Sequence, residues 1–177
     1  MAIKDKFFRY VFQKATSFKC NPREIVAIAN AKTIGILFDA THPHQVDVIK
    51  KFVDSLHQQG KTVTLFGFYN KKKITPESNV TVNDGIITRA DLHWYGLPNK
   101  STYASISNQH FDILINTCTW HCIPLLVISA ASKAKFRIGK YFEDATNCFD
   151  FMLNLDANTS LEEFLTQIKD FSTKLRN

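Results

Sequence analysis

No stretch of this 177-residue sequence approaches the roughly 20 consecutive apolar residues that a membrane-spanning helix needs. The N-terminus carries charges but no apolar segment followed by a small-residue cleavage site, so we expect no secretory signal. The sequence also lacks a dense cysteine framework, because its four cysteines are scattered over the chain at Cys20, Cys118, Cys122 and Cys148. We therefore expect a cytoplasmic protein with reduced thiols.

Glycine is scarce where nucleotide-binding motifs would need it. None of the six glycines lies in the DATHPH segment that follows the first predicted strand. Neither the GxGxxG pattern nor a P-loop is therefore present. A standard dinucleotide or P-loop site is not expected, and we predict no cofactor.

Excess positive charge is confined to the N-terminal segment. Of the net charge of +6, residues 1–23 carry +5, from six basic residues against Asp5 alone, which leaves +1 for the other 154 residues. The body of the protein is close to neutral, so we expect no nucleic-acid-binding face.

Residues 3–18 are predicted to form an amphipathic helix with Phe8, Val11 and Phe12 on one face. We favour docking of this face on the domain or on a second subunit. The alternatives are contact with nucleic-acid phosphates and a peripheral membrane contact, in which residues 3–19 lie on an anionic bilayer.

Short apolar runs alternate with amphipathic segments along the rest of the chain. Continuous apolar runs are typical of buried parallel strands, and their alternation with helices indicates helices on both faces of the sheet. We predict a single three-layer, mainly parallel, Rossmann-like α/β domain over residues 31–177, with a basic helical extension over residues 1–30. The predicted strands are 33–38, 62–68, 86–94, 111–116, 136–139 and 149–155, and the predicted helices after the first are 22–29, 44–59, 101–108, 123–135 and 161–175.

Three runs of this sequence carry a resemblance to known proteins: "AKTIGILFDAT", "DLHWYGLP", and "FDILIN" with the later "LLVISAASKAKFRIGKY" and "FDFMLNL". They resemble a family of short, uncharacterised α/β proteins from Bacteroidota over most of the chain. A fainter similarity is to the N-terminal half of heptosyltransferase-type glycosyltransferases, which use a second Rossmann-like domain that this chain is too short to supply. Both resemblances imply a fold rather than an activity.

Polar residues follow three of the predicted strands. In an open α/β sheet, ligands bind beyond the carboxyl ends of the strands, near the point where the strand order reverses. The DATHPH segment supplies a carboxylate and two imidazoles, which suit acid–base or metal chemistry. Alternatively, Thr41 caps the next helix and the histidines are exposed. The ligand-binding candidates are Asp39, Thr41, His42, His44, Asn70, Asn116, Thr117, Cys118 and His121.

The CTWHC segment, residues 118–122, raises the question of a metal or a reactive thiol. Its Cys118, His121 and Cys122 would supply three of the four ligands of a zinc ion. Because Pro124 is tolerated only in a first helical turn, the helix begins no earlier than about His121, and helical periodicity does not support a shared ligand face. We expect no metal. A cysteine near a helix N-terminus can be a reactive thiolate, whereas the alternative is that Cys122 packs as a small apolar residue.

The sequence leaves three hypotheses of function. We favour a non-catalytic domain that binds a small molecule or a partner, with a homodimer as one form of partner. For the aromatic "HWY" cluster of residues 93–95, closure of the core or a subunit contact is favoured, and the alternative is stacking of a ligand. The second hypothesis is a small enzyme or a sugar-nucleotide-binding module with its site at the carboxyl strand ends. The third is a peripheral membrane adaptor that uses the basic N-terminal helix.

Overall fold

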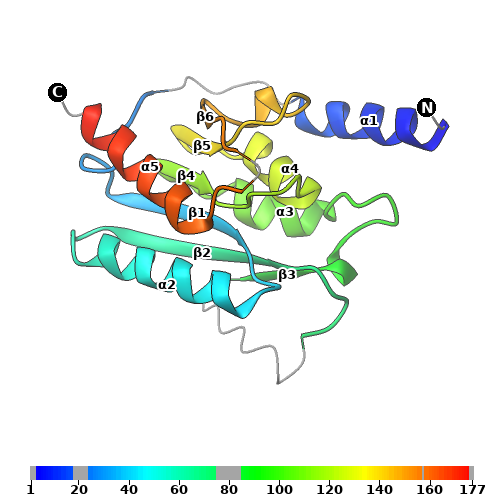
Figure 1. The fold of residues 1–177 in the computed structure, drawn as a ribbon. Helices are drawn as coiled ribbons and strands as arrows, with labels where there is room; N and C mark the ends of the chain where they lie inside the picture. Colours follow the sequence, from blue (N-terminus) through cyan, green and yellow to red (C-terminus); the bar gives the residue numbers. More distant parts are fainter. Residues whose placement is uncertain (1–2, 18–23, 75–84, 157, 176–177) are drawn as a thin grey trace.

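Six strands form one sheet in the order β3-β2-β1-β4-β5-β6, and every neighbouring pair is parallel (Figure 1). This computed structural model describes residues 3–17, 24–74, 85–156 and 158–175, with the side chains of the first helix described from Tyr10 onward. The strands are β1 (Thr33–Asp39), β2 (Thr62–Tyr69), β3 (Ile86–Thr88), β4 (Ile113–Asn116), β5 (Phe136–Lys140) and β6 (Phe151–Leu153). The helices are α1 (Ile3–Thr16), α2 (Pro43–His57), α3 (Lys100–Ser107), α4 (Ile123–Ala131) and α5 (Leu161–Lys174).

The strand order reverses between β1 and β4. The chain first builds β1, β2 and β3 outward in one direction, and then returns to place β4 on the other side of β1. The two central strands are in register from Ile34 opposite Ile113 to Leu37 opposite Asn116. Since all strands are parallel, their carboxyl ends lie along one edge of the sheet, and the reversal creates a switch point at that edge.

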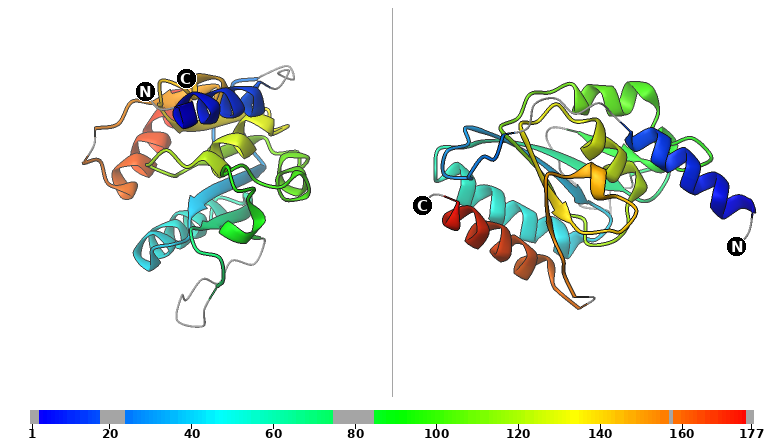
Figure 2. Two further views of the ribbon diagram at one scale, coloured as in Figure 1. Left: turned by 90° about the vertical axis from the view of Figure 1, so that its right-hand side faces the viewer. Right: turned by 90° about the horizontal axis from the view of Figure 1, so that it is seen from above.

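Helices cover both faces of the sheet, which confirms the predicted fold class (Figure 2). On one face, α2 and α5 pack over β1, β4 and β5 with side chains such as Ile49 and Phe164, neither of which is exposed at all. On the other face, α3 and α4 pack over β2, β1 and β4, with Leu125 and Ile128 at the centre. Each of these helices therefore has an apolar side facing the sheet, as the sequence periodicity requires.

Local signals in the sequence explain where several helices begin and end. Ser160 and Glu163 form the reciprocal capping box at the start of α5. Pro43 and Pro124 lie in the first turns of α2 and α4, where the missing N–H of proline is tolerated. Gly60 has a φ of 74° and ends α2, since its N–H bonds to His57 and the next N–H bonds to Leu56.

The helix predicted for residues 22–29 is wrong over its described part. Residues 24–27 have no regular structure and are followed by a turn, while Asn21 and Pro22 lie outside the described residues. The N–H of Glu24 donates to the carbonyl of Lys135, and the N–H of Ile28 donates to the hydroxyl of Ser172. Bonds to distant parts of the fold thus replace the bonds that a local helix would make.

Two further boundaries differ from the sequence prediction. The strand predicted over residues 86–94 ends at Thr88, because Thr88 and Asp91 form a capping box that turns the chain into a short 3₁₀ helix, Arg89–Asp91. Helix α3 begins at Lys100 with Asn99 at its N-cap position, so Ser101, which the sequence predicts as the cap, lies inside the helix.

The basic helix α1 lies against the outer side of α4 (Figure 2). Phe12 is 4% exposed and packs with Leu126, Val127 and Ala130 of α4. None of the helices in the described part of the chain is both long enough and apolar enough to cross a bilayer.

A charged pair is buried between the sheet and α4. The Nε and one terminal nitrogen of Arg137 donate to the two carboxylate oxygens of Asp150, at 3.0 and 2.9 Å. The other terminal nitrogen donates to the carbonyls of Ser129 and Ala130 in the last turn of α4. Arg137 is only 2% exposed, and it therefore adds a hydrogen-bond donor for carbonyl groups at the end of α4, of which that of Ser129 also accepts the backbone N–H of Ser132.

Candidate functional site

The switch point holds a buried carboxylate, that of Asp39 at the end of β1. Asp39 is 5% exposed. Its Oδ1 accepts a hydrogen bond from the backbone N–H of Thr41 at 2.8 Å, and its Oδ2 accepts one from the indole Nε1 of Trp120, also at 2.8 Å. No described Lys, Arg or His forms an ion pair with Asp39, so both partners of this buried carboxylate are neutral.

The candidates Thr41 and Asn70 join Asp39 in one hydrogen-bonded chain across the ends of β1 and β2. The hydroxyl of Thr41 accepts from the backbone N–H of Asn70 at 3.0 Å, while the backbone of Thr41 binds Asp39. Thr41 does not cap α2 with its side chain, because the N-cap residue is His42 and no side chain caps this helix. The structure thus brings Asp39, Thr41 and Asn70 together, as the sequence predicts.

Trp120 covers this end of the sheet. Its ring is tilted against that of Phe68, with 6.5 Å between the ring centroids, and the residue is 39% exposed. Trp120 is not among the predicted ligand-binding residues, because the sequence gives no signal for a bond between this loop residue and a carboxylate 81 positions away. Its position makes it the solvent-facing partner of Asp39.

Two candidates at the end of β4, Asn116 and Thr117, have their polar side chains engaged inside the protein. Asn116 is buried, accepting from the backbone N–H of Cys118 at 3.1 Å and donating to the hydroxyl of Ser129 at 3.2 Å. The hydroxyl of Thr117 donates to the carbonyl of Leu37 on β1 at 3.0 Å. These bonds fix the loop that carries Trp120 to the central strands.

The histidines do not converge with Asp39 into one acid–base cluster. His42 and His44 are exposed, and Nε2 of His44 lies 3.7 Å from a carboxylate oxygen of Glu162 on α5. Nε2 of His121 lies 3.0 Å from Oδ1 of Asp144. Each of these last two imidazoles therefore has its own carboxylate partner elsewhere.

His121 belongs to an aromatic contact with α1. Its ring lies 5.5 Å from that of Phe12 and 5.2 Å from that of Phe142, measured between centroids. The imidazole thus links the CTWHC loop to the docked N-terminal helix.

The described cysteines are buried, free thiols. Burial and the neighbouring Cys118 raise the pKa of the Cys122 thiol well above its usual range, and burial raises the pKa of Cys148 to about 12. A raised pKa opposes formation of the thiolate, which is the nucleophile and the metal ligand. Cys122 occupies the N-cap position of α4 and packs in the core beside Leu125. Cys20 lies outside the described residues.

Among the residues that the structure describes, no three His, Cys, Asp or Glu side chains lie close enough to hold a metal ion. Two cations lie at the same edge of the sheet as Asp39. The Nζ of Lys140 donates to the carbonyl of Thr119 at 2.9 Å, and the Nζ of Lys71 lies 5.9 Å from the ring centroid of Tyr69. The arrangement offers a hydrogen-bond acceptor at Asp39, an aromatic cover at Trp120 and nearby positive charge.

A family model described as a family of unknown function (DUF6913) matches residues 4–175. The match spans nearly the whole chain, and the chain therefore belongs to this family. No curated protein and no solved structure matches the chain. The family description assigns no activity.

Proposed function

We propose that this member of DUF6913 is a binding domain that holds a small polar molecule at Asp39 without transforming it. The observation that carries the proposal is a buried carboxylate at the switch point of the sheet whose partners are two neutral N–H groups. A buried charge is costly unless it is paired, so a ligand with O–H or N–H donors would improve on the indole of Trp120. Sugars, nucleosides and small amines carry such donors.

Binding is favoured over catalysis by the state of the reactive groups nearby. The thiol of Cys122 is buried with a raised pKa, and His121 is paired with Asp144. General acid–base or nucleophilic chemistry needs such groups within hydrogen-bond reach of the reacting atoms. The free thiols of Cys118, Cys122 and Cys148 fit a cytoplasmic location, which is part of this proposal.

Tryptophan fluorescence tests the ligand site. In a Trp94→Phe protein, the remaining tryptophan is Trp120, and its emission should change on saturation with a ligand from a panel of sugars, nucleosides and amines. Asp39→Asn should weaken binding by about tenfold or more, because one acceptor is replaced by a donor. The ligand should be recovered chemically unchanged. If no member of the panel binds, or if Asp39→Asn binds equally well, the site is wrongly assigned; a converted ligand would instead indicate an enzyme.

A second candidate function, self-association, is favoured by Trp94. This residue is 81% exposed, and its ring contacts the edge of Tyr95, which stacks on His93. Exposed tryptophans are strongly enriched among the residues that dominate subunit interfaces. Sedimentation velocity should show a dimer that Trp94→Ser dissociates. A wild-type protein that remains a monomer at high concentration would remove this candidate.

A further inference from the structure

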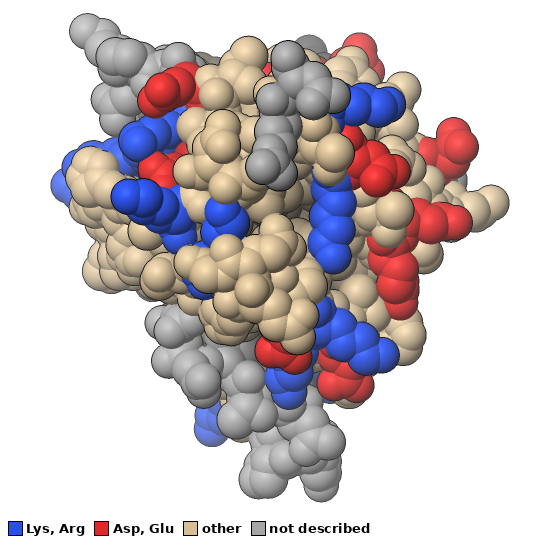
Figure 3. Space-filling model, turned by 90° about the vertical axis from the view of Figure 1, so that its left-hand side faces the viewer, with Lys and Arg blue, Asp and Glu red and all other residues tan. Residues whose placement is uncertain are grey.

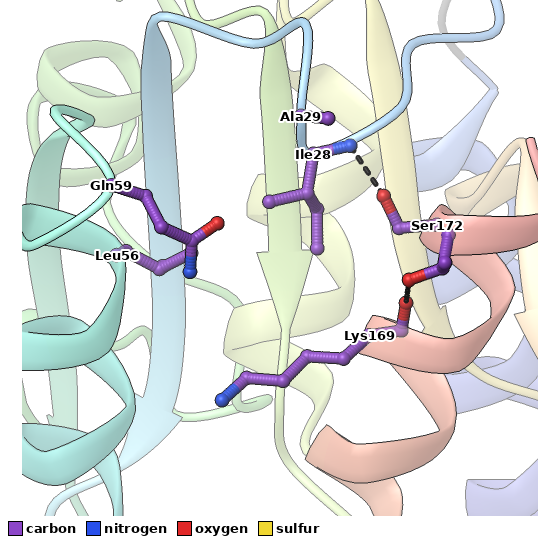
Figure 4. A pocket seen from close by; sticks show the side chains of 7 residues that line it. Ile28, Ala29, Leu56, Gln59, Lys169 and Ser172 are labelled. Atoms are coloured by element: carbon purple, nitrogen blue, oxygen red, sulfur yellow. Dashed lines mark hydrogen bonds between the residues drawn. The ribbon is translucent and has the colours of Figure 1, made fainter. Parts of the chain in front are cut away.

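A cavity lies between α2 and α5, at the amino-terminal end of the sheet and therefore opposite the Asp39 site. It has a volume of about 240 Å³ and is lined by Ile28, Ala29, Leu56, Gln59, Lys169, Ser172 and Thr173. Figure 4 shows the side chains of Gln59, just beyond α2, and of Lys169, on α5, extending toward each other, with Ile28 near Ser172. We propose that this cavity binds a short aliphatic carboxylate, with its anionic group at Lys169 and its apolar body on Ile28 and Leu56.

The floor of the cavity is apolar. Leu56 is completely buried and Ile28 is 5% exposed. The backbone N–H of Ile28 donates to the hydroxyl of Ser172, so the polar groups at the base are already bonded to each other. A ligand that reaches the floor therefore meets hydrocarbon and needs an apolar portion of its own.

The polar wall carries an ammonium group with no carboxylate partner among the described residues. The Nζ of Lys169 donates to the hydroxyl of Ser55 at 3.2 Å and lies 5.1 Å from the ring centroid of Phe52. None of the four described ion pairs includes Lys169. The side-chain amide of Gln59 donates to the carbonyl of the same Ser55. Lys169 and Gln59 are thus held on one residue of α2, at the side of the cavity.

Two ammonium groups lie at the cavity. No Asp or Glu is among its described lining residues, and besides Lys169 the Nζ of Lys61 donates to the carbonyl of Ala29 at the rim. The carboxyl-terminal ends of α2 and α5 carry partial negative charge from the helix dipole, which disfavours binding of an anion here. In α2 this effect is reduced, since the N–H groups of Gly60 and Lys61 bond to the final carbonyls.

Figure 3 views this end of the molecule and shows Lys and Arg side chains interspersed with Asp and Glu side chains. Among these lysines, the exposed Lys32 directly precedes β1 and the exposed Lys135 precedes β5, where Lys135 forms an ion pair with Asp112. The attraction for an anion therefore comes from Lys169 and Lys61 at the cavity itself. A carboxylate suits the cavity better than a phosphate, because Lys169 is the one charged lining residue and no backbone N–H cluster for a phosphate is among the lining groups.

Nitrogen-15 NMR titration of the full chain with sodium butyrate tests the proposal, with butyramide as the neutral probe of nearly equal shape. Butyrate should give saturable shifts in the amides of Ala29, Gln59 and Thr173, and butyramide should not. Lys169→Gln should weaken butyrate binding by about tenfold, and Lys169→Arg should retain it. Lys174→Gln is the matched control, since Lys174 lies on α5 but does not line the cavity.

Three results would overturn the assignment. They are the absence of saturable shifts with butyrate, equal shifts with butyramide, and unchanged binding in Lys169→Gln. Lys169 is exposed, so the variant is expected to fold, and an unchanged amide spectrum away from α2 and α5 verifies this.

Discussion

The indole Nε1 of Trp120 donates to Oδ2 of Asp39 at 2.8 Å, which ties the loop after β4 to the end of β1 at the switch point of the sheet. Trp120→Phe removes this donor and leaves a buried carboxylate oxygen without its partner. We expect a loss of about 1–2 kcal/mol in the free energy of unfolding, measured by urea denaturation. Trp94→Phe, at an 81% exposed position, should change stability by less than about 0.5 kcal/mol. An equal loss in both variants would mean that the bond to Asp39 contributes nothing specific.

The sequence predicts this site in part. Apolar runs identify β1, β2 and β4, and parallel strands must bring Asp39, Thr41 and Asn70 to one edge. Periodicity does not reveal which way a side chain turns after a strand ends. Asn116 therefore looks like a ligand-binding residue in the sequence, although its amide bonds to the buried Ser129.

Contacts between distant segments explain the remaining differences. His44 lies near Glu162, and Ile28 bonds to Ser172, at sequence separations that no local pattern encodes. The cavity between α2 and α5 is likewise formed by residues that are distant in the sequence. Gln59 and Lys169 meet only because the two helices pack on one face of the sheet. Local signals, by contrast, are sufficient to predict where α2 ends and where α5 begins, because Gly60 ends α2 and Ser160 caps the start of α5.

The buried pair of Arg137 and Asp150 should be one of the most sensitive positions in the chain. Asp150→Ala leaves a guanidinium that is 2% exposed without its carboxylate. We expect a loss of about 3–5 kcal/mol in unfolding free energy, because an uncompensated buried charge remains. Asp144→Ala breaks the more exposed pair with His121 and should cost less than about 1 kcal/mol. Similar losses for the two variants in urea denaturation would contradict this expectation.

Asp112 should make stability depend on acidity. The Lys135 ammonium, together with the backbone N–H groups of Lys32 and Thr33, holds the pKa of Asp112 well below its usual range, against the opposing effect of burial. As the pH falls, the carboxylate of Asp112 is therefore protonated at a higher pH in the unfolded chain than in the folded protein. Its contribution to the free energy of unfolding is present at neutral pH and is lost as the pH falls below about 4. Asp112→Asn should have a lower free energy of unfolding than wild type at pH 7, and the difference between the two proteins should become smaller in acid.

Lys135→Met is the matched variant for this prediction, since the bond to Lys135 is the largest cause of the lowered pKa. Lys135→Met should lose part of the same unfolding free energy at pH 7. Its difference from wild type should also become smaller in acid. Chemical denaturation of the three proteins across a pH series measures the effect. A difference between wild type and Asp112→Asn that stays constant with pH would show that the carboxylate is not specifically stabilised.

The thiols provide a test of the buried environment around CTWHC. In a Cys20→Ser protein, the remaining cysteines are Cys118, Cys122 and Cys148, all buried. Because burial raises the pKa of Cys122 and Cys148, few thiolates form at neutral pH. Ellman's reagent should detect no fast-reacting thiol in the native protein and all three after unfolding. Rapid reaction of one thiol in the native state would revive the alternative of a reactive cysteine in this loop.

Phe12 should determine whether the basic helix α1 stays on the domain. The residue is 4% exposed, its ring lies against His121, and it packs on α4, so Phe12→Ala removes the most deeply buried apolar side chain among the described residues of the helix. The amides of α1 should then exchange with deuterium much faster, since local opening becomes easier, whereas Tyr10→Ala at a 63% exposed position should leave exchange unchanged.

Sedimentation with anionic vesicles separates docking of α1 on the domain from binding of α1 to a membrane. Docking predicts that the wild type stays in solution, because a membrane contact through Phe12 would require α1 to leave α4. Wild-type binding to vesicles that disappears when residues 1–19 are deleted would instead support the membrane alternative.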